Sequence, residues 1–578
     1  MTNKKKNLKN TNITQIISGV IILIALNIIG NFVFTRFDLT AEKRFTLSDA
    51  TKSLLKSVDD VVFFKIYLEG DFPAGFKKLN RETKEMLDEF RAYNKNIQYE
   101  FINPSESSDK NIRNGMYQEL YSKGLDPTNL QVKTKEGSTQ QIIFPGGIVN
   151  YKNRELPLQL LSTQMGTDPE SQLNNSSQLL EYNMANVIRK LDNEKKKKIA
   201  FITGHGELDE NETADIISSL SEYYTVERVA INEQIGKLTE HKIIDSTRVH
   251  IRNKYDLIVI AKPESAFSEK DKFIIDQFIM HGGKALWLVD NVFASMDSLN
   301  GTDETVAINN SLNLDDMLFK YGARINYNLI MDLNALPIPI VTGNMGSQPQ
   351  QTFVPWYYFP LLMPVSAHPV VKNLNAIKTE FISSIDTVGS NDEIKKTVLL
   401  TTSKYSRIVN TPAVITLEIL RKTPPAQLFN KPFIPVCLLL EGEFSSLYKN
   451  RMPTEILSSR EIGFVEKSKA NKQIVISDGD IIKNQFNKAK NFPYPLGYDK
   501  YTKQRFGNKD LIMNAIDYLC DDNGLILCRT KEITMRLLDK NKVEENRVSI
   551  QFANTAIPVA LIMLFGFIQY FLRKRKYR

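Results

Sequence analysis

The feature that most constrains this chain is an almost unbroken apolar stretch near its start, residues 16–34. A helix needs about 20 apolar residues to cross roughly 30 Å of hydrocarbon. The only polar side chains in the stretch are Ser18, Asn27 and Asn31, and the residues before it include Lys4, Lys5, Lys6 and Lys9. Because basic residues stay on the cytoplasmic side, we expect a cytoplasmic segment 1–12, a transmembrane helix 13–35 and an exported chain beyond it.

A cleaved signal peptide is the alternative interpretation of this stretch. The stretch is longer than the apolar core of about 7–15 residues that signal peptides carry, and no A-x-A-like cleavage site follows it. No cysteine lies near its end, so a lipoprotein anchor has no attachment point. We therefore favour an uncleaved membrane anchor.

A second apolar stretch, residues 550–572, lies near the other end of the chain. It contains Asn554 and Pro558, and membrane helices tolerate a proline. The basic tail 573–578 that follows belongs on the cytoplasmic side. The sequence therefore predicts two single transmembrane helices, both termini cytoplasmic, with most of the chain between them outside.

Composition excludes several classes of protein. The chain of 578 residues is long enough for three or more domains, and 24% charged residues argue against a polytopic membrane protein and against general disorder. The net charge of +8 comes from the two termini, so nucleic acid is not an expected partner. The three cysteines form neither a disulfide framework nor a metal-binding spacing. Cys437 is expected in a buried strand, and whether Cys520 and Cys528 pair is left open.

Residues 36–193 are expected to form a first domain, in which Thr46 or Ser48 caps a short helix. Its β-α-β-α-β-β order is that of a thioredoxin-like unit. The redox C-x-x-C is missing, which makes the unit a scaffold. The predicted strands are 61–68, 97–102 and 148–151, the hairpin is 130–135 with 140–144, and the main helices are 77–94, 112–123 and 179–191.

Residues 194–335 are expected to form a central α/β domain with a parallel sheet, because strands and helices alternate. The nearly continuous apolar run 255–261 is typical of a strand that is covered on both faces. The predicted strands are 199–203, 225–229, 255–261 and 285–290, and the predicted helices are 213–223 and 269–280.

Residues 336–549 are expected to form a proline- and aromatic-rich loop followed by a further α/β region. Seven prolines and a cluster of aromatics in 334–369 exclude a regular helix. We expect a long ordered loop packed by its own aromatics, or alternatively an exposed surface that binds a partner. Further strands are predicted at 396–402, 413–419, 433–440 and 473–477, and a helix at 511–519.

The best candidate site is the run Gly204-His205-Gly206-Glu207, because ligands in open α/β sheets bind beyond the carboxyl ends of strands. His205 and Glu207 suggest acid–base chemistry, but a structural turn with occasional ligand contacts is favoured over catalysis. Asp290, Asp478 and Asp480 also follow strands, and the last two fit a helix cap and turn better than a metal site. No nucleophile elbow or nucleotide-binding motif occurs.

Together, these motifs resemble the gliding-motility-associated ABC transporter auxiliary family of Bacteroidota, known as GldG. The residues that carry the resemblance are Arg36-Phe37-Asp38-Leu39-Thr40, Thr46-Leu47-Ser48, Thr203-Gly204-His205-Gly206-Glu207, Ser477-Asp478-Gly479-Asp480 and Gly507-Asn508-Lys509-Asp510, with Arg529 and Lys531. They occur in order over nearly the whole region between the two anchors.

The resemblance implies a non-catalytic subunit of the bacterial inner membrane that works with a polytopic ABC permease and a cytoplasmic ABC ATPase. It implies a central domain similar to one in an intraflagellar transport subunit and to amidotransferase-like α/β folds, whose nucleophilic cysteine has no counterpart here. No cofactor or metal is expected, and a periplasmic ligand or a protein of the motility machinery is a possible further partner. ATP hydrolysis by the partners would move the membrane helices, and Arg36, Asp38, Thr40, Thr46 and Ser48 would transmit that motion.

Two other functions stay open at this point. An envelope hydrolase or carbohydrate-binding protein would use the 204–207 turn, and alanine at His205 and Glu207 would abolish its activity. A pure scaffold would depend on no ATPase. The sequence names no transported substrate.

Overall fold

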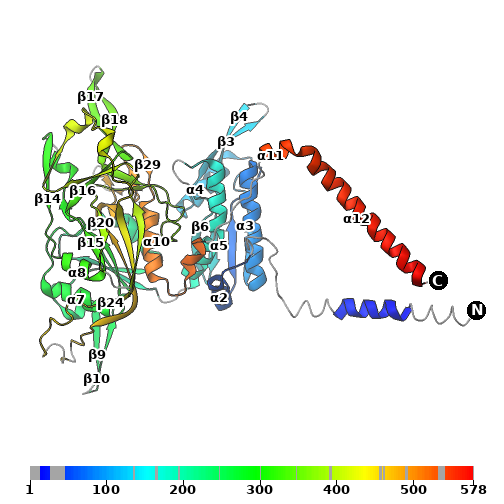
Figure 1. Cartoon of the computed structure of the whole chain (residues 1–578), viewed down its shortest axis with the longest axis horizontal. Coiled ribbons are helices and arrows are strands. Elements are labelled where there is room, and N and C mark those ends of the chain that lie inside the picture. Colours follow the sequence, from blue (N-terminus) through cyan, green and yellow to red (C-terminus); the bar gives the residue numbers. More distant parts are fainter. Residues whose placement is uncertain are drawn as a thin grey trace, which may run out of the picture. The chain divides into compact units, whose positions relative to one another are not determined.

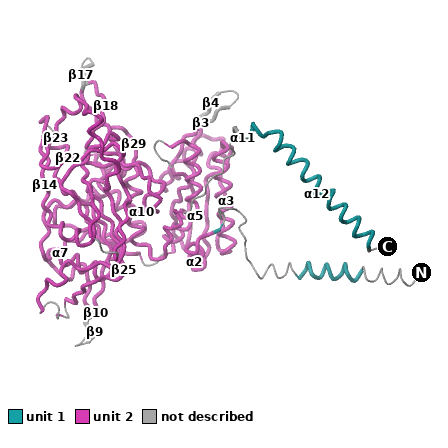
Figure 2. Tube along the Cα trace, viewed as in Figure 1, with its two compact units in different colours: residues 1–46, 532–578 teal, residues 47–531 magenta. Residues whose placement is uncertain are grey.

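The computed structural model describes residues 13–25, 46–134, 137–162, 167–192, 196–245, 248–299, 301–345, 348–389, 393–454, 459, 462–487, 492–530 and 540–576. The chain divides into two units (Figure 2). The first consists of residues 1–46 and 532–578, and the second of residues 47–531. The two units are described separately below.

The first unit contains the apolar helices. Over the described residues, one helix is long and apolar enough to cross a membrane: Arg547–Arg575, with a mean hydropathy of 2.0. It lies within α12 (Arg547–Lys576), which has Pro558 in its interior and follows the short α11 (Lys540–Glu545). This confirms an apolar helix over the predicted stretch 550–572. Near the N-terminus a shorter apolar helix spans Ile13–Ala25, and residues 26–35 of the predicted anchor lie outside the described residues.

The second unit begins with a four-stranded sheet of order β2-β1-β5-β6. Figure 1 shows helices α3, α4 and α5 in this part of the chain. Strand β1 is parallel to β2 and antiparallel to β5, and β5 is antiparallel to β6. The predicted hairpin is present as β3 and β4, which form a separate two-stranded sheet. The strands are β1 (Val62–Ile66), β2 (Ile97–Phe101), β3 (Thr128–Thr134), β4 (Gly137–Ile143), β5 (Gly146–Tyr151) and β6 (Arg154–Gln159), and the helices are α2 (Asp49–Ser57), α3 (Ala74–Tyr93), α4 (Lys110–Ser122) and α5 (Pro169–Asp192).

A seven-stranded sheet of order β21-β24-β25-β12-β11-β7-β8 forms the centre of the second unit. The five strands from β25 to β8 are parallel, which confirms the predicted parallel sheet. At one side β24 is antiparallel to β25, and β21 is antiparallel to β24. The sheet takes strands from both sides of the predicted boundary at residue 335. Its strands are β7 (Lys198–Thr203), β8 (Thr225–Ala230), β11 (Leu257–Ala261), β12 (Lys284–Leu288), β21 (Ile394–Thr401), β24 (Pro435–Ser445) and β25 (Lys467–Ile476).

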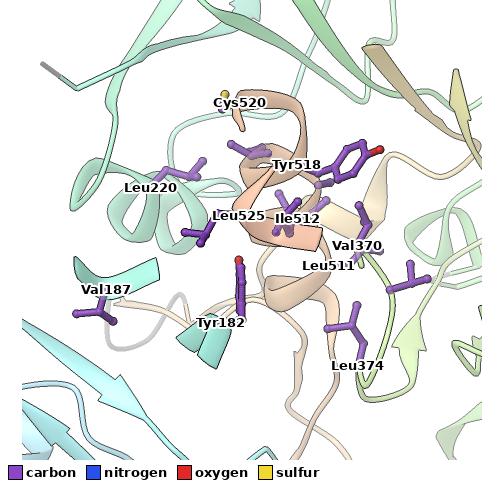
Figure 3. Close-up of a cluster of buried hydrophobic side chains, with 14 of the residues drawn as sticks. Tyr182, Val187, Leu220, Val370, Leu374, Leu511, Ile512, Tyr518, Cys520 and Leu525 are labelled. Atoms are coloured by element: carbon purple, nitrogen blue, oxygen red, sulfur yellow. The ribbon is translucent and has the colours of Figure 1, made fainter. Parts of the chain in front are cut away.

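Helices cover both faces of this sheet, as the wholly buried β11 requires. Leu257 and Val259 face a core shared with α5, α6 (Ala214–Ser221) and α10 (Asn508–Cys520). Ile258 and Ile260 face the opposite core, which contains α7 (Glu269–Met280) and α8 (Asp315–Tyr321). Figure 3 shows part of the first core, where side chains of α5, α6 and α10 lie close together.

The proline- and aromatic-rich segment is a β-hairpin, so the predicted loop is wrong. Strands β17 (Ala335–Met345) and β18 (Gln348–Leu362) pair antiparallel, with Pro337 opposite Pro355. An extended strand accepts the fixed φ of proline wherever the missing N–H is not needed by the ladder. The aromatics are packed as expected, since Trp356 is fully buried and Tyr357, Tyr358 and Phe359 are nearly so. This burial contradicts the alternative that they form an exposed partner-binding surface.

The remaining strands are short and complete the second unit. They are β9 (Thr239–Asp245), β10 (Arg248–Asn253), β13 (Val292–Phe293), β14 (Glu304–Asn309), β15 (Ala323–Ile325), β16 (Asn328–Asp332), β19 (Ile377–Lys378), β20 (Ile385–Thr387), β22 (Ser406–Asn410), β23 (Ala413–Thr416), β26 (Phe486–Asn487), β27 (Phe492–Pro493), β28 (Tyr498–Asp499) and β29 (Gln504–Arg505). All three cysteines are free and buried, and Cys437 lies in β24 as predicted.

Candidate functional site

The polar residues singled out in the sequence follow adjacent parallel strands. The 204–207 turn follows β7, Asp290 lies just beyond β12, and Asp478 and Asp480 lie just beyond β25. Because these strands are parallel, their carboxyl ends lie on the same side of the sheet. All of these residues therefore lie beyond that side. The chain passes from β7 to β8 on one side and then to β11 on the other, so the ends of β7 and β11 mark the topological switch point at which such sheets bind ligands.

Asp290, Asp478 and Asp480 are brought together around a lysine that follows β11. The four residues are called the Lys262 cluster below. Lys262 Nζ lies 2.5 Å from Asp480 Oδ2 and 3.6 Å from Asp290 Oδ2. The backbone N–H of Gly479 donates to Asp290 Oδ1 at 2.7 Å. Asp478 is fully buried, and its two oxygens accept the backbone N–H groups of Glu380 and Asp480.

The electrostatics of the Lys262 cluster follow from burying three carboxyl groups around one ammonium group. Burial lowers the pKa of Lys262, but the charges of Asp480 and Asp290 outweigh it and raise that pKa well above its ordinary value. Burial raises the pKa of Asp290 to about 6, against the effect of Lys262. Burial, with the charges of Asp290 and Asp480, also raises the pKa of Asp478. The ammonium group occupies the place that a bound cation would take among these carboxyl groups.

The 204–207 turn holds His205 between two carboxylates. The imidazole Nδ1 lies 3.1 Å from Glu207 Oε1, and Nε2 lies 3.1 Å from Asp271 Oδ2 in the first turn of α7. The ring stacks on Phe267 at 3.7 Å between centroids, and His205 is 6% exposed. Gly204 and Gly206 have φ of 115° and 76°, which favour glycine.

The two carboxylates also determine the electrostatics of His205. Burial lowers the pKa of His205, but its hydrogen bond and charge interaction with Glu207, and then those with Asp271, raise it overall. Both ring nitrogens lie within hydrogen-bond distance of a carboxylate. The sequence favours a structural turn here over a hydrolase site, and that choice stays a prediction.

The chain itself covers the sheet edge beyond β7. After β25, a single helical turn (Asp480–Ile482) places Ile481 and Ile482 at 0% exposure. Asn484 then donates its backbone N–H to Glu212 O and its side-chain amide to Asn211 O, both at 2.8 Å. Lys483 pairs with Glu212 at 2.8 Å. Residues 483–484 are therefore fixed to residues 211–212, which follow the 204–207 turn.

The predicted coupling segment is only partly described, because Arg36, Asp38 and Thr40 lie outside the described residues. Ser48 is the N-cap of α2, and its hydroxyl accepts the backbone N–H of Thr51 at 3.1 Å. Ser48 Oγ also lies 2.9 Å from Cys528 Sγ, 480 positions later in the chain. Glu181 of α5 accepts both the Ser48 backbone N–H and the Thr51 hydroxyl. Thr46 is the first described residue of this region.

Sequence reasoning missed three partners that complete these sites: Lys262, Asp271 and Glu181. Lys262 directly follows a buried apolar strand, which is the same signal that singled out Asp290. Asp271 and Glu181 carry no comparable signal, since their roles depend on how α7 and α5 are packed.

A mixed α/β unit joined to an apolar C-terminal helix is suited to association with a membrane. Residues 196–515, more than half of the chain, match a family described as ABC-type uncharacterized transport system, and the chain belongs to this family. It is an auxiliary component of that kind of transport system. Residues 41–150 match a domain of unknown function (DUF7088).

Two further similarities are to individual proteins. An uncharacterized protein of Borreliella burgdorferi is 22% identical over 582 residues, covering 100% of both chains. A solved structure titled mmIFT52 N-terminal domain is 13% identical, and the match covers 56% of this chain and 99% of that one with a TM-score of 0.29. A score this low does not establish a shared fold.

Proposed function

We propose that this protein is a membrane-anchored, non-catalytic subunit of an ABC transport complex, and that it couples movement of its partners to a folded unit outside the membrane. Its partners are a polytopic permease and a cytoplasmic ATPase, and both of its termini are cytoplasmic at the bacterial inner membrane. Membership of the transport-system family supports the association with ABC components. The apolar α12 supports a membrane anchor.

The observation that carries the coupling role is the contact between Ser48 and Cys528. These residues lie next to the two ends of the second unit, which spans residues 47–531. The chain therefore enters and leaves this unit at one place. A displacement of either connecting segment acts on the same few residues, with Glu181 fixing α2 to α5 beside them.

The finer assignments rest on the resemblance stated above. We include in the proposal a role in gliding motility of the GldG kind, and a periplasmic ligand or motility protein as a further partner. A thioredoxin-like first part is supported by the strand order β2-β1-β5-β6 with β1 parallel to β2. An amidotransferase-like central part is supported by the parallel strands of the seven-stranded sheet.

The test of partnership is purification of the full-length chain from native membranes in detergent. We expect a polytopic permease and an ATPase to co-purify in a fixed ratio. Recovery of the folded chain without either partner contradicts the proposal.

The test of coupling is a flexible Gly-Ser insert placed immediately before Thr46. We expect the complex to assemble as before. We also expect that the rate of its transport-linked ATP hydrolysis no longer depends on this subunit. An insert of equal length at the tip of the β17–β18 hairpin is the control, because the hairpin is remote in sequence from both connecting segments. Unchanged function with the first insert contradicts the coupling role.

A further inference from the structure

The second unit contains a cavity of about 710 Å³ that lies beside the ends of the unit rather than at the sheet edge described above. Its lining comes from α2, the end of α5, the loop after α6 and the segment that follows α10. Cavities of roughly 300–1,000 Å³ are the size that holds small molecules in proteins. None of the residues of the Lys262 cluster or of the 204–207 turn belongs to this lining.

One face of α2 forms a wall of the cavity. Asp49, Ala50, Ser53, Leu54 and Ser57 line it, and their spacing places them on a single helical face. The face that packs into the core is a different one, because Thr51 and Leu55 are fully buried. Apart from Asp49, this wall is therefore built from small and apolar side chains.

The cations of the lining are Arg189, Lys190 and Lys197. Lys197 is already paired with Asp522 and with the carbonyl oxygen of Cys520, which leaves Arg189 and Lys190 as the cations considered for a ligand. Lys190 Nζ lies 3.7 Å from the centre of the Tyr223 ring and 3.9 Å from Asp517 Oδ2, which is beyond hydrogen-bond distance. Among the described residues, Arg189 makes one hydrogen bond, to Asn186 Oδ1 at 2.7 Å, and Lys190 makes none. An ammonium group has three N–H donors and a guanidinium group five, so most of these donors remain available.

The nearby carboxylates do not accept hydrogen bonds from most of the side-chain N–H groups of Arg189 and Lys190. Asp517 is shared, since Oδ1 accepts the Tyr224 hydroxyl at 2.6 Å and lies 3.5 Å from Arg189. Asp521 lies 3.9 Å from Arg189 and accepts the backbone N–H groups of Asn523 and Ile526. Burial lowers the pKa of Lys190, and the charge of Asp517 opposes this, so a second anion beside the ammonium group would favour its charged form.

We propose that this cavity binds a small hydroxylated organic anion. Its carboxylate or phosphate group contacts Lys190 and Arg189, and its body lies against Leu54 of α2, Tyr223 and Leu525. Asp49 and Asp192, which also line the cavity, accept hydrogen bonds from its hydroxyl groups. Because Asp49 directly follows Ser48, the ligand contacts the helix that Ser48 caps.

The experiment is isothermal titration calorimetry of the full-length protein in detergent with glucuronate, glucose 6-phosphate and glucose, at equal ionic strength. The two anions distinguish a carboxylate from a phosphate, and neutral glucose is the matched control. We expect at least one anion to bind at least tenfold more tightly than glucose. If neither anion exceeds glucose by that factor, the proposal is overturned.

Three variants locate the binding. Lys190→Met is expected to weaken binding of the anion at least tenfold, and Ser53→Trp, which fills the cavity from an exposed position, to abolish it. Lys56→Met removes one charge from the same helix without touching the cavity, and it should bind as the wild type does. Equal weakening by Lys56→Met, or wild-type binding by both Lys190→Met and Ser53→Trp, overturns the proposal. Ser53→Trp keeps the test valid if Lys190→Met fails to fold.

Discussion

Gly479 and Lys262 approach so closely that a side chain on the glycine would collide with the lysine. A Cβ atom on Gly479 would lie 2.4 Å from Lys262 Cβ and 2.9 Å from its Cα. The approach brings the backbone N–H of Gly479 within 2.7 Å of Asp290 Oδ1. Glycine is needed here for space, because its φ of −77° is open to any residue.

Gly479→Ala is therefore expected to destabilise the protein by about 1–3 kcal/mol, the usual cost of overpacking a well-packed site. The measurement is the free energy of thermal unfolding of the full-length protein in detergent. Gly115→Ala is the matched control, because Gly115 lies in α4 with no atom within 4 Å of the added group. That change should stabilise the helix by up to about 1 kcal/mol. Equal effects of the two changes would contradict the close approach.

Lys262→Met is expected to destabilise the protein by about 3–5 kcal/mol at neutral pH, because it leaves buried carboxylates without their cation. The native pKa of Asp290, about 6, is above the unfolded value of about 3.9, so its ionisation costs stability as the pH rises through 6. The defect of Lys262→Met should therefore be smaller at about pH 5 than at about pH 8.

Lys270→Met is the control for this prediction. Its ammonium group pairs with Glu233 at the surface, where its side chain is 73% exposed, so this change should cost far less stability than Lys262→Met. Thermal unfolding at both pH values measures the difference. A defect of Lys262→Met that is independent of pH would show that Asp290 is not titrating beside it.

His205→Gln is expected to lose more stability at low pH than at high pH. The native pKa of His205 is raised, so its contribution is complete below the unfolded value of about 6.5 and is lost as the pH rises through the native value. The unfolding free energies of wild type and variant, followed from about pH 6 to about pH 9, should therefore converge.

His281→Gln provides the contrast, because burial lowers the pKa of His281. A lowered histidine pKa penalises the native state at low pH. The free energy of unfolding of the wild type should therefore increase relative to that of this variant as the pH rises. Parallel curves for both variants would contradict the assigned directions.

Ser48→Ala is expected to cost about 1 kcal/mol, because it removes the N-cap of α2. Since the same hydroxyl contacts Cys528, hydrogen exchange should accelerate both in residues 49–57 and in residues 525–530. Ser53→Ala, on an exposed face of the same helix, should change neither segment. Acceleration confined to residues 49–57 would show that the contact does not link the two ends of the unit.

Local signals made part of the fold predictable. The predicted helix 269–280 has the same bounds as α7, because Ser268 caps its start and Gly282, with φ of 91°, follows its end. The apolar run around β11 likewise identified a strand covered on both faces. These features depend on residues within one turn or one strand.

Long-range pairing was not predictable in the same way. The hairpin of β17 and β18 was missed because its prolines exclude a helix but do not distinguish a loop from an extended strand. At the site, strand ends identified Asp290, Asp478 and Asp480, while their joint contact with Lys262 depends on β25 lying beside β12. Nothing local in either strand specifies that neighbour.

The position of β25 in the middle of the sheet also determines the order in which the chain can fold. Trp287 of β12 donates its indole N–H to Gln473 of β25 at 2.9 Å, across 186 positions of sequence. A chain made from its N-terminus completes β12 long before β25 exists, and an unpaired apolar edge promotes wrong pairing. Closing so long a loop is entropically costly and slow. We therefore expect the β12 edge of nascent chains to need protection until residue 476 has been synthesised.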